Sequence, residues 1–117
     1  MLSFYYLKNC TTCKRILQEL EISNSLGLVD IKNKPINNTD LEFLKSLSGS
    51  YEALFSKKAQ LYKKRNLKEK KLSEADFKKL ILEHYTFLKR PVLVLDNNIY
   101  IGSSPKVVDQ AKENLNG

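Results

Sequence analysis

Two cysteines separated by two threonines are the residues of this sequence best suited to chemistry. Cys10-Thr11-Thr12-Cys13 follows a short apolar segment rich in aromatic residues (Leu2–Leu7) and precedes apolar residues at helical spacing. The pattern therefore predicts that the CxxC lies where a strand meets a helix. Cys10 is expected at, or just before, the first helical residue.

This position predicts a reactive thiol at Cys10. The first turn of a helix has unpaired N–H groups and a partial positive charge, and both favour a thiolate over a thiol. Lys8, Lys14 and Arg15 add positive charge nearby. Cys13 lies one turn further on the same face, near enough to form a disulfide with Cys10. We therefore interpret Cys10 as a nucleophile and Cys13 as its resolving cysteine in a dithiol–disulfide cycle.

Two other interpretations of the cysteine pair are a zinc site and a structural disulfide. Zinc would require two more ligands, but the chain has no further cysteine and only one histidine, His84. A disulfide that closes so short a loop would stabilise the fold little. Redox or thiol chemistry is the favoured interpretation, and no metal is expected. His84, near a predicted helix end, is interpreted as a partly exposed side chain rather than a catalytic base.

Length and composition predict one domain spanning residues 1–117. No apolar segment is long enough to cross a bilayer, and the N-terminus does not have the pattern of a signal peptide. A cytoplasmic monomer is therefore expected, and in that compartment paired cysteines are more often reactive than structural.

The chain is basic, with a net charge of +7 and a pI near 9.4. Most lysines recur at helical spacing and alternate with acids, as in Lys68-Glu69-Lys70-Lys71, which is typical of solvated helix faces. A basic balance permits a nucleic-acid partner. An anionic substrate or an acidic protein surface is preferred here over direct DNA binding.

Apolar and turn residues predict strands at both ends of the chain. A second strand at Leu26–Ile31 would pair in parallel with the first across a helix. Val92–Leu95 and Ile99–Ile101, joined by the turn Asp96-Asn97-Asn98, predict an antiparallel hairpin. A last helix is expected from Pro105, which suits the first turn.

The segment between these strands, about residues 39–86, is predicted to be an all-helical insertion. Asn38 or Thr39 would cap its first helix, and residues 51–67 would form two short helices. Ser73 and Asp76 suit a capping box at a further helix. The order β-α-β, insertion, β-β-α predicts an α/β fold of thioredoxin-like type, with a four-stranded mixed sheet.

Three features together resemble the arsenate reductase (ArsC-like) family, which includes the Spx-type regulators. They are the CxxC followed by Lys14 after the first strand, Arg90-Pro91 before an apolar strand, and a hairpin that ends in Gly102. The resemblance extends over essentially the whole chain. It implies a cis peptide bond at Pro91, facing the reactive cysteine, and an Arg90 directed at the Cys10 sulfur.

The resemblance also implies an anion site. In arsenate reductases three arginines surround the oxyanion; one corresponds to Arg90, whereas the others fall at Ser56 or Lys57 and near Ser103. Lys57 could supply charge but not a bidentate fork, which argues against efficient arsenate reduction. The expected anion-binding residues are therefore Arg90, with Lys57, Thr11, Thr12 and Pro91.

Two functions follow from this resemblance. The first is a thiol-dependent oxidoreductase with a small oxyanion or disulfide substrate, no bound cofactor, and glutathione with glutaredoxin, or thioredoxin, as electron donor. The second is an Spx-type regulator in which the same disulfide is a switch, with RNA polymerase as partner. Cys13 and the Gly49-Ser50 break resemble the Spx type, in which this region meets the polymerase α-subunit.

Overall fold

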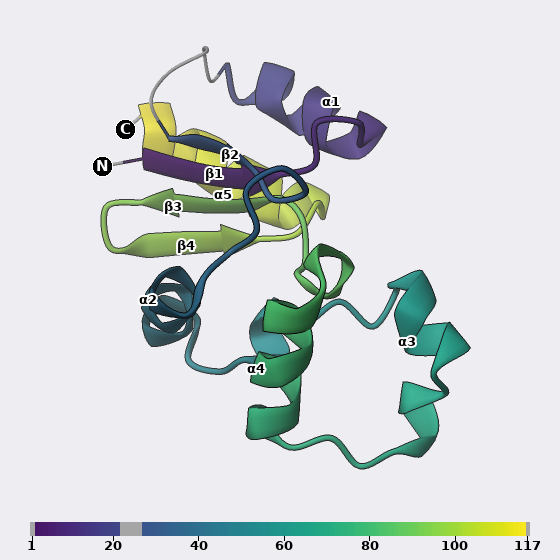
Figure 1. The fold of residues 1–117 in the computed structure, drawn as a ribbon. Helices are drawn as coiled ribbons and strands as arrows, with labels where there is room; N and C mark the ends of the chain where they lie inside the picture. The colour runs from purple at the N-terminus through teal and green to yellow at the C-terminus, as the bar shows by residue number, and fades with distance from the viewer. Residues whose placement is uncertain (1, 22–26, 117) are drawn as a thin grey trace. The chain divides into compact units, whose positions relative to one another are not determined.

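A four-stranded mixed sheet organises the two ends of the chain in the computed structural model, which describes residues 2–21 and 27–116 (Figure 1). Strand order is β2-β1-β3-β4. β1 (Leu2–Tyr6) pairs in parallel with β2 (Leu28–Asp30) and antiparallel with β3 (Val92–Leu95), which forms a hairpin with β4 (Asn98–Ile101). The predicted fold class is confirmed.

The second strand is shorter than predicted from the apolar residues Leu26–Ile31. β2 ends at Asp30, and Ile31 belongs to the following turn, although its N–H still donates to the Tyr6 carbonyl at 3.0 Å. Leu26 lies outside the described residues. Ile31 is almost fully buried, so its apolar character reflects packing rather than strand pairing.

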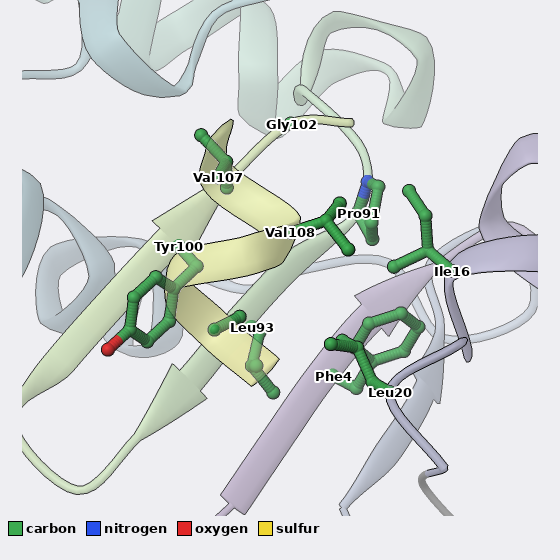
Figure 2. Close-up of a pocket in the computed structure, with 10 residues that line it drawn as sticks. Phe4, Ile16, Leu20, Pro91, Leu93, Tyr100, Gly102, Val107 and Val108 are labelled. Atoms are coloured by element: carbon green, nitrogen blue, oxygen red, sulfur yellow. The ribbon is translucent and has the colours of Figure 1, made fainter. Parts of the chain in front are cut away.

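Helices α1 (Thr11–Glu19) and α5 (Pro105–Asn116) pack on the same face of this sheet. Phe4 and Leu93 are cross-strand partners, so their side chains share one face. Figure 2 shows both beside apolar side chains from the two helices. The buried cluster comprises Phe4, Ile16, Leu20, Leu93, Val108 and Ala111. Its burial positions the start of α1, and hence the cysteines, against the end of β1.

Gly27 allows the chain to enter β2 close to β1. Its φ is +125°, and a Cβ at this position would lie 2.2 Å from the Leu2 carbonyl oxygen. Its own carbonyl accepts from the Phe4 N–H at 2.7 Å. Only glycine fits both the left-handed backbone and this approach.

The chain forms two compact units, one of Met1–Lys34 with Arg90–Gly117 and the other of Pro35–Lys89. The second unit is the predicted helical insertion with slightly wider bounds. Its elements are α2 (Asn38–Ser48), η1 (Glu52–Leu54), α3 (Gln60–Lys64), η2 (Leu67–Glu69), α4 (Glu74–Glu83) and η3 (Tyr85–Phe87). The single-domain assignment stays a prediction.

Two local predictions in this unit need correction. The cap of α2 is Asn37, whose side chain accepts from the Asp40 N–H at 2.8 Å, rather than Asn38 or Thr39. Residues 51–67 form three short elements instead of two, because Ala59 is extended and Asn66 adopts a left-handed conformation with φ of 51°. The capping box of Ser73 and Asp76 is confirmed.

Three phenylalanines form the centre of the second unit. The Phe55 ring stacks on Phe87 with centroids 5.3 Å apart and packs at 4.8 Å from Phe77. Phe55 and Leu88 form an isolated antiparallel bridge, which ties the start of the helical segment to its end. His84 is half-buried and its Nδ1 lies 2.8 Å from the Thr86 hydroxyl, as expected of a satisfied side chain.

Within the described residues, no helix is long and apolar enough to span a membrane.

Candidate active site

Cys10 is the N-cap residue of α1. Its backbone is extended (φ −86°, ψ 115°), its N–H donates to the Leu7 carbonyl at 3.0 Å, and its carbonyl accepts from the Lys14 N–H at 3.0 Å. The predicted position of the CxxC between strand and helix is therefore confirmed. The turn at Lys8-Asn9 directs Cys10 to the open end of the helix, where backbone N–H groups lack intrahelical partners.

The surroundings of Cys10 favour the thiolate. Partial burial would raise the pKa of Cys10, but the Cys13 N–H and thiol and the Thr12 N–H donate to its sulfur, and Arg90 adds positive charge. Together these interactions lower the pKa of Cys10 below its ordinary value. The side chain is partly exposed, so a substrate can reach the sulfur. Low pKa and access are the two properties of a reactive cysteine.

Cys13 has the opposite environment. It is fully buried, and burial raises the pKa of its thiol to about 11, although the Leu7 N–H donates to its sulfur. The hydrogen bond to Cys10 and the charge on Cys10 raise the pKa of Cys13 further. Both cysteines are in the free thiol form in this structure. Of the two thiols, Cys10 is therefore the easier to deprotonate, and Cys13, with a pKa of about 11, is its protonated partner.

The Arg90–Pro91 peptide bond is cis, as the family resemblance implies. Pro91 is buried, and its carbonyl accepts from the Gly102 N–H at 2.9 Å, which fixes the segment against the end of β4. Tyr5 and Val92 are register partners, so the Arg90–Pro91 segment enters the sheet beside the end of β1, from which the CxxC continues. Arg90 is half-buried. Its positive charge favours the thiolate form of both cysteines, although burial keeps the pKa of Cys13 raised.

The other predicted anion-binding residues divide between the two units. Thr11 and Thr12 are exposed in the first turn of α1, and Thr12 contributes its backbone N–H to the Cys10 sulfur. Lys57 belongs to the second unit, where its Nζ pairs with Glu52 Oε2 at 2.9 Å. The role of Lys57 in anion binding stays a prediction.

One contributor to the site was missed from the sequence. The Leu7 backbone N–H donates to Cys13, and no side-chain pattern could have indicated it. The thiol pair is thus held from two sides, by the strand end at Leu7 and by the first turn of α1.

The pocket shown in Figure 2 lies beside this site but differs in character. The ring of Pro91 forms part of its wall, together with apolar side chains of the sheet, α1 and α5. Its lining includes Ile16, Leu93 and Val108 and has almost no polar surface. It cannot orient an anion, so we interpret it as a gap in the packing of the core.

No group of three or more His, Cys, Asp or Glu side chains within residues 2–21 and 27–116 is arranged to hold a metal ion.

A CxxC at a helix N-terminus beside a cis-proline, on a β2-β1-β3-β4 sheet, defines a thioredoxin-like protein with a thiol site. The ArsC family model matches residues 5–111. The chain therefore belongs to the ArsC family, as the sequence resemblance indicated.

The individual relatives include a transcriptional regulator and arsenate reductases. The global transcriptional regulator Spx 2 of Bacillus anthracis is 28% identical over 107 residues, covering 87% of this chain and 79% of that protein. The arsenate reductase from Vibrio cholerae superposes with a TM-score of 0.77 at 22% identity, covering 94% of this chain and 96% of that one. An arsenate reductase-related protein from Brucella melitensis gives a TM-score of 0.70 at 22% identity, covering 93% and 92%. These two structural likenesses show the fold.

Proposed function

We propose that this protein is a thiol-dependent oxidoreductase of the ArsC family in which Cys10 is the nucleophile and Cys13 the resolving cysteine. The observation that carries the proposal is the contrast between the two thiols. Cys10 is accessible, with a lowered pKa, whereas the Cys13 thiol is buried, protonated and hydrogen-bonded to it. Family membership supports this assignment.

The proposed cycle has two exchanges. The Cys10 thiolate attacks one sulfur of a substrate disulfide, forms a mixed disulfide and releases the other sulfur as a thiolate. Cys13 then attacks Cys10 Sγ, releases the second substrate thiol and leaves a Cys10–Cys13 disulfide. Two electrons pass to the substrate. Glutathione with glutaredoxin, or thioredoxin, would return two electrons to restore the dithiol.

The mixed disulfide would itself activate Cys13. In the resting protein the Cys10 sulfur raises the pKa of Cys13 both through their hydrogen bond and through its charge. Both effects disappear once Cys10 is bonded to substrate, whereas the Leu7 N–H and Arg90 continue to favour a Cys13 thiolate. The Cys13 thiol would therefore be easier to deprotonate after Cys10 has reacted than before, although burial, the largest cause of its raised pKa, remains.

Arg90 is proposed to bind an anionic group of the substrate and to stabilise the thiolate, with Thr11, Thr12 and Pro91 forming the adjoining surface. Lys57 is proposed as a weaker second charge. Arsenate is not the favoured oxyanion, because Lys57 or Ser56, and Ser103, stand where arsenate reductases have arginine. A planar guanidinium donates two parallel hydrogen bonds to two oxygens of one oxyanion, and neither lysine nor serine reproduces this geometry.

The test is NADPH consumption by the reduced protein with arsenate or with a small disulfide. Each substrate is assayed with glutathione, glutaredoxin and glutathione reductase, and separately with thioredoxin and its reductase. Cys10→Ser should abolish turnover, and Cys13→Ser should accumulate a mixed disulfide at Cys10 that is visible by intact mass. Turnover that survives in Cys10→Ser would refute the assignment.

A second candidate function is a redox-switched regulator of Spx type, supported by the 28% identity to Spx 2 and by the paired cysteines. In this case the Cys10–Cys13 disulfide would alter a surface that binds the RNA polymerase α-subunit. Gly49, in the region that resembles Spx, ends α2 with φ of +91° and faces open space. Failure of turnover with every donor, combined with redox-dependent binding to RNA polymerase, would favour this candidate.

A further inference from the structure

The net positive charge of the chain is concentrated in one segment of the second unit. Residues 57–71 contain eight basic side chains and one acidic one, whereas the rest of the chain contains twelve of each. We call residues 57–71 the basic lobe. Its basic residues are Lys57, Lys58, Lys63, Lys64, Arg65, Lys68, Lys70 and Lys71.

The basic lobe is a packed part of its unit rather than a charged tail. Ala59 and Leu67 are buried, and the Tyr62 ring contacts the Phe55 ring edge-on with centroids 5.9 Å apart. Arg65 pairs with Glu83 at 2.6 Å. These contacts hold α3 and η2 in place, so the exposed lysines project from a packed segment.

Most of the charge in the lobe is not neutralised by the protein. All eight basic side chains are exposed. Lys57 pairs with Glu52, and Arg65 with Glu83. Among the described residues, the other six have no ion-pair partner: Lys58, Lys63, Lys64, Lys68, Lys70 and Lys71. Six close positive charges repel one another, and an anionic partner would relieve that repulsion.

The kind of basic residue indicates the kind of partner. Protein–protein interfaces are enriched in arginine and aromatic residues at their centres and depleted in lysine. In the basic lobe the single arginine is already engaged, since Arg65 pairs with Glu83 and lies 5.7 Å from the Phe87 ring centroid. What remains is lysine, which lacks the bidentate fork of arginine but, as a flexible point charge, neutralises backbone phosphates.

We propose that the basic lobe is a binding surface for the phosphate backbone of a nucleic acid, without sequence preference. Binding would rest on neutralising phosphates and releasing their counterions. If all six unpaired lysines contact phosphates, the logarithm of the association constant for duplex DNA falls against the logarithm of salt concentration with a slope of about −5.

The experiment uses the reduced full chain and fluorescence anisotropy. The probes are two short labelled DNA duplexes of unrelated sequence, an RNA of the same length, and labelled poly-L-glutamate as an acidic polypeptide. Each is titrated between about 50 and 200 mM salt, where phosphate-driven binding changes steeply. DNA and RNA have the same phosphate groups in their backbones, and comparing the two probes shows which of them the protein prefers.

Two variants with the same change in net charge separate the lobe from the overall charge. The lobe variant carries Lys63→Gln, Lys64→Gln, Lys68→Gln and Lys70→Gln. The control carries Lys32→Gln, Lys34→Gln, Lys106→Gln and Lys112→Gln, which are exposed positions of the first unit. Circular dichroism checks folding. If the lobe variant unfolds, two double variants replace it: Lys63→Gln with Lys64→Gln in α3, and Lys68→Gln with Lys70→Gln at η2 and the residue after it.

We expect the lobe variant to bind nucleic acid at least about tenfold more weakly, with a salt slope shallower by about four. The control should stay within about twofold of the parent, and the two duplexes should bind equally. Equal weakening by both variants would overturn the proposal, as would absence of binding at about 50 mM salt. Lobe-dependent binding of poly-L-glutamate as tight as that of DNA would overturn it in favour of an acidic protein.

Discussion

In the unit formed by residues 1–34 and 90–117, both thiols and Arg90 lie together, and eight basic side chains are accompanied by six acidic ones. In the unit formed by residues 35–89 there is no cysteine, and twelve basic side chains accompany seven acidic ones. In the first unit, hydrogen bonds and burial set the reactivity of the Cys10 sulfur. The second unit packs around phenylalanines and has exposed lysines on its surface. Substitutions should therefore affect the two properties separately.

The largest effect should be seen when Cys10→Ser and the lobe variant are each measured in both assays, disulfide turnover and DNA binding. Cys10→Ser should lower disulfide turnover at least about a thousandfold, because the attacking thiolate is lost. Its affinity for duplex DNA should stay within about twofold of the parent. The four-lysine lobe variant should show the reverse pattern in the same NADPH and anisotropy assays. Loss of both activities in either variant would show that the two units do not act independently.

The core of the second unit offers the next largest effect. Phe55→Ala should lower the free energy of unfolding by about 3–5 kcal/mol, because Phe55 is almost fully buried among Phe77 and Phe87. Phe43→Ala, at a side chain that is 39% exposed in the same unit, is the matched control and should cost about 0.5 kcal/mol or less. Urea denaturation measures both, and equal midpoints for the two variants would contradict the described core.

A glycine pair tests the sheet of the first unit. Gly27→Ala should destabilise the protein by about 2 kcal/mol or more, since the new Cβ would meet the Leu2 carbonyl in addition to the strain of a positive φ. Gly102→Ala also has positive φ but meets nothing within 4 Å, so it should cost about 1 kcal/mol. A larger loss at Gly102 than at Gly27, by thermal or urea unfolding, would be inconsistent with this backbone approach.

The smallest expected effect is electrostatic. The rate at which iodoacetamide alkylates Cys10 should rise with pH through a midpoint below that of an ordinary cysteine, because the pKa of Cys10 is lowered. Cys13, with a pKa of about 11, should react only in strong alkali. Arg90→Gln should move the Cys10 midpoint upward, because loss of the positive charge destabilises the Cys10 thiolate.

The control for this electrostatic prediction is Lys14→Gln, an exposed position next to Cys13 in sequence that should leave the midpoint unchanged. Mass spectrometry of the two cysteine-containing peptides assigns each rate. An unchanged midpoint in Arg90→Gln would mean that the hydrogen bonds from Cys13 and Thr12, and not Arg90, stabilise the thiolate.

Periodicity and turn residues were sufficient to predict the order of strands and helices, the hairpin around Asp96 and the place of Cys10 at a helix start. These features are encoded locally. The cap of α2 was missed because Asn37, Asn38 and Thr39 are all good caps, and residue preference alone does not choose among them. The contrast between the two thiols also depends on distant groups, since Arg90 is eighty residues from Cys10.

The basic lobe shows a different limit of sequence interpretation. Its lysines have helical spacing, which is typical of an ordinary solvated surface, and Glu69 among them suggested balanced charge. Two observations together set the lobe apart: its eight basic residues accompany one acidic residue, and only two of the eight, Lys57 and Arg65, have an ion-pair partner in the described structure.

The ends of the basic lobe are fixed by contacts that do not involve its lysines. Before it, the Ser56 N–H donates to the Phe87 carbonyl at 2.7 Å. After it, the capping box at Ser73 starts α4, and the Glu74 carboxylate accepts from the N–H groups of Tyr51 and Glu52 at 2.7 and 3.1 Å. The exposed lysines between these anchors, Lys57 aside, can therefore change in charge during evolution without loss of the contacts that hold the segment. Members of one family could diverge in what they bind while their redox chemistry is inherited unchanged.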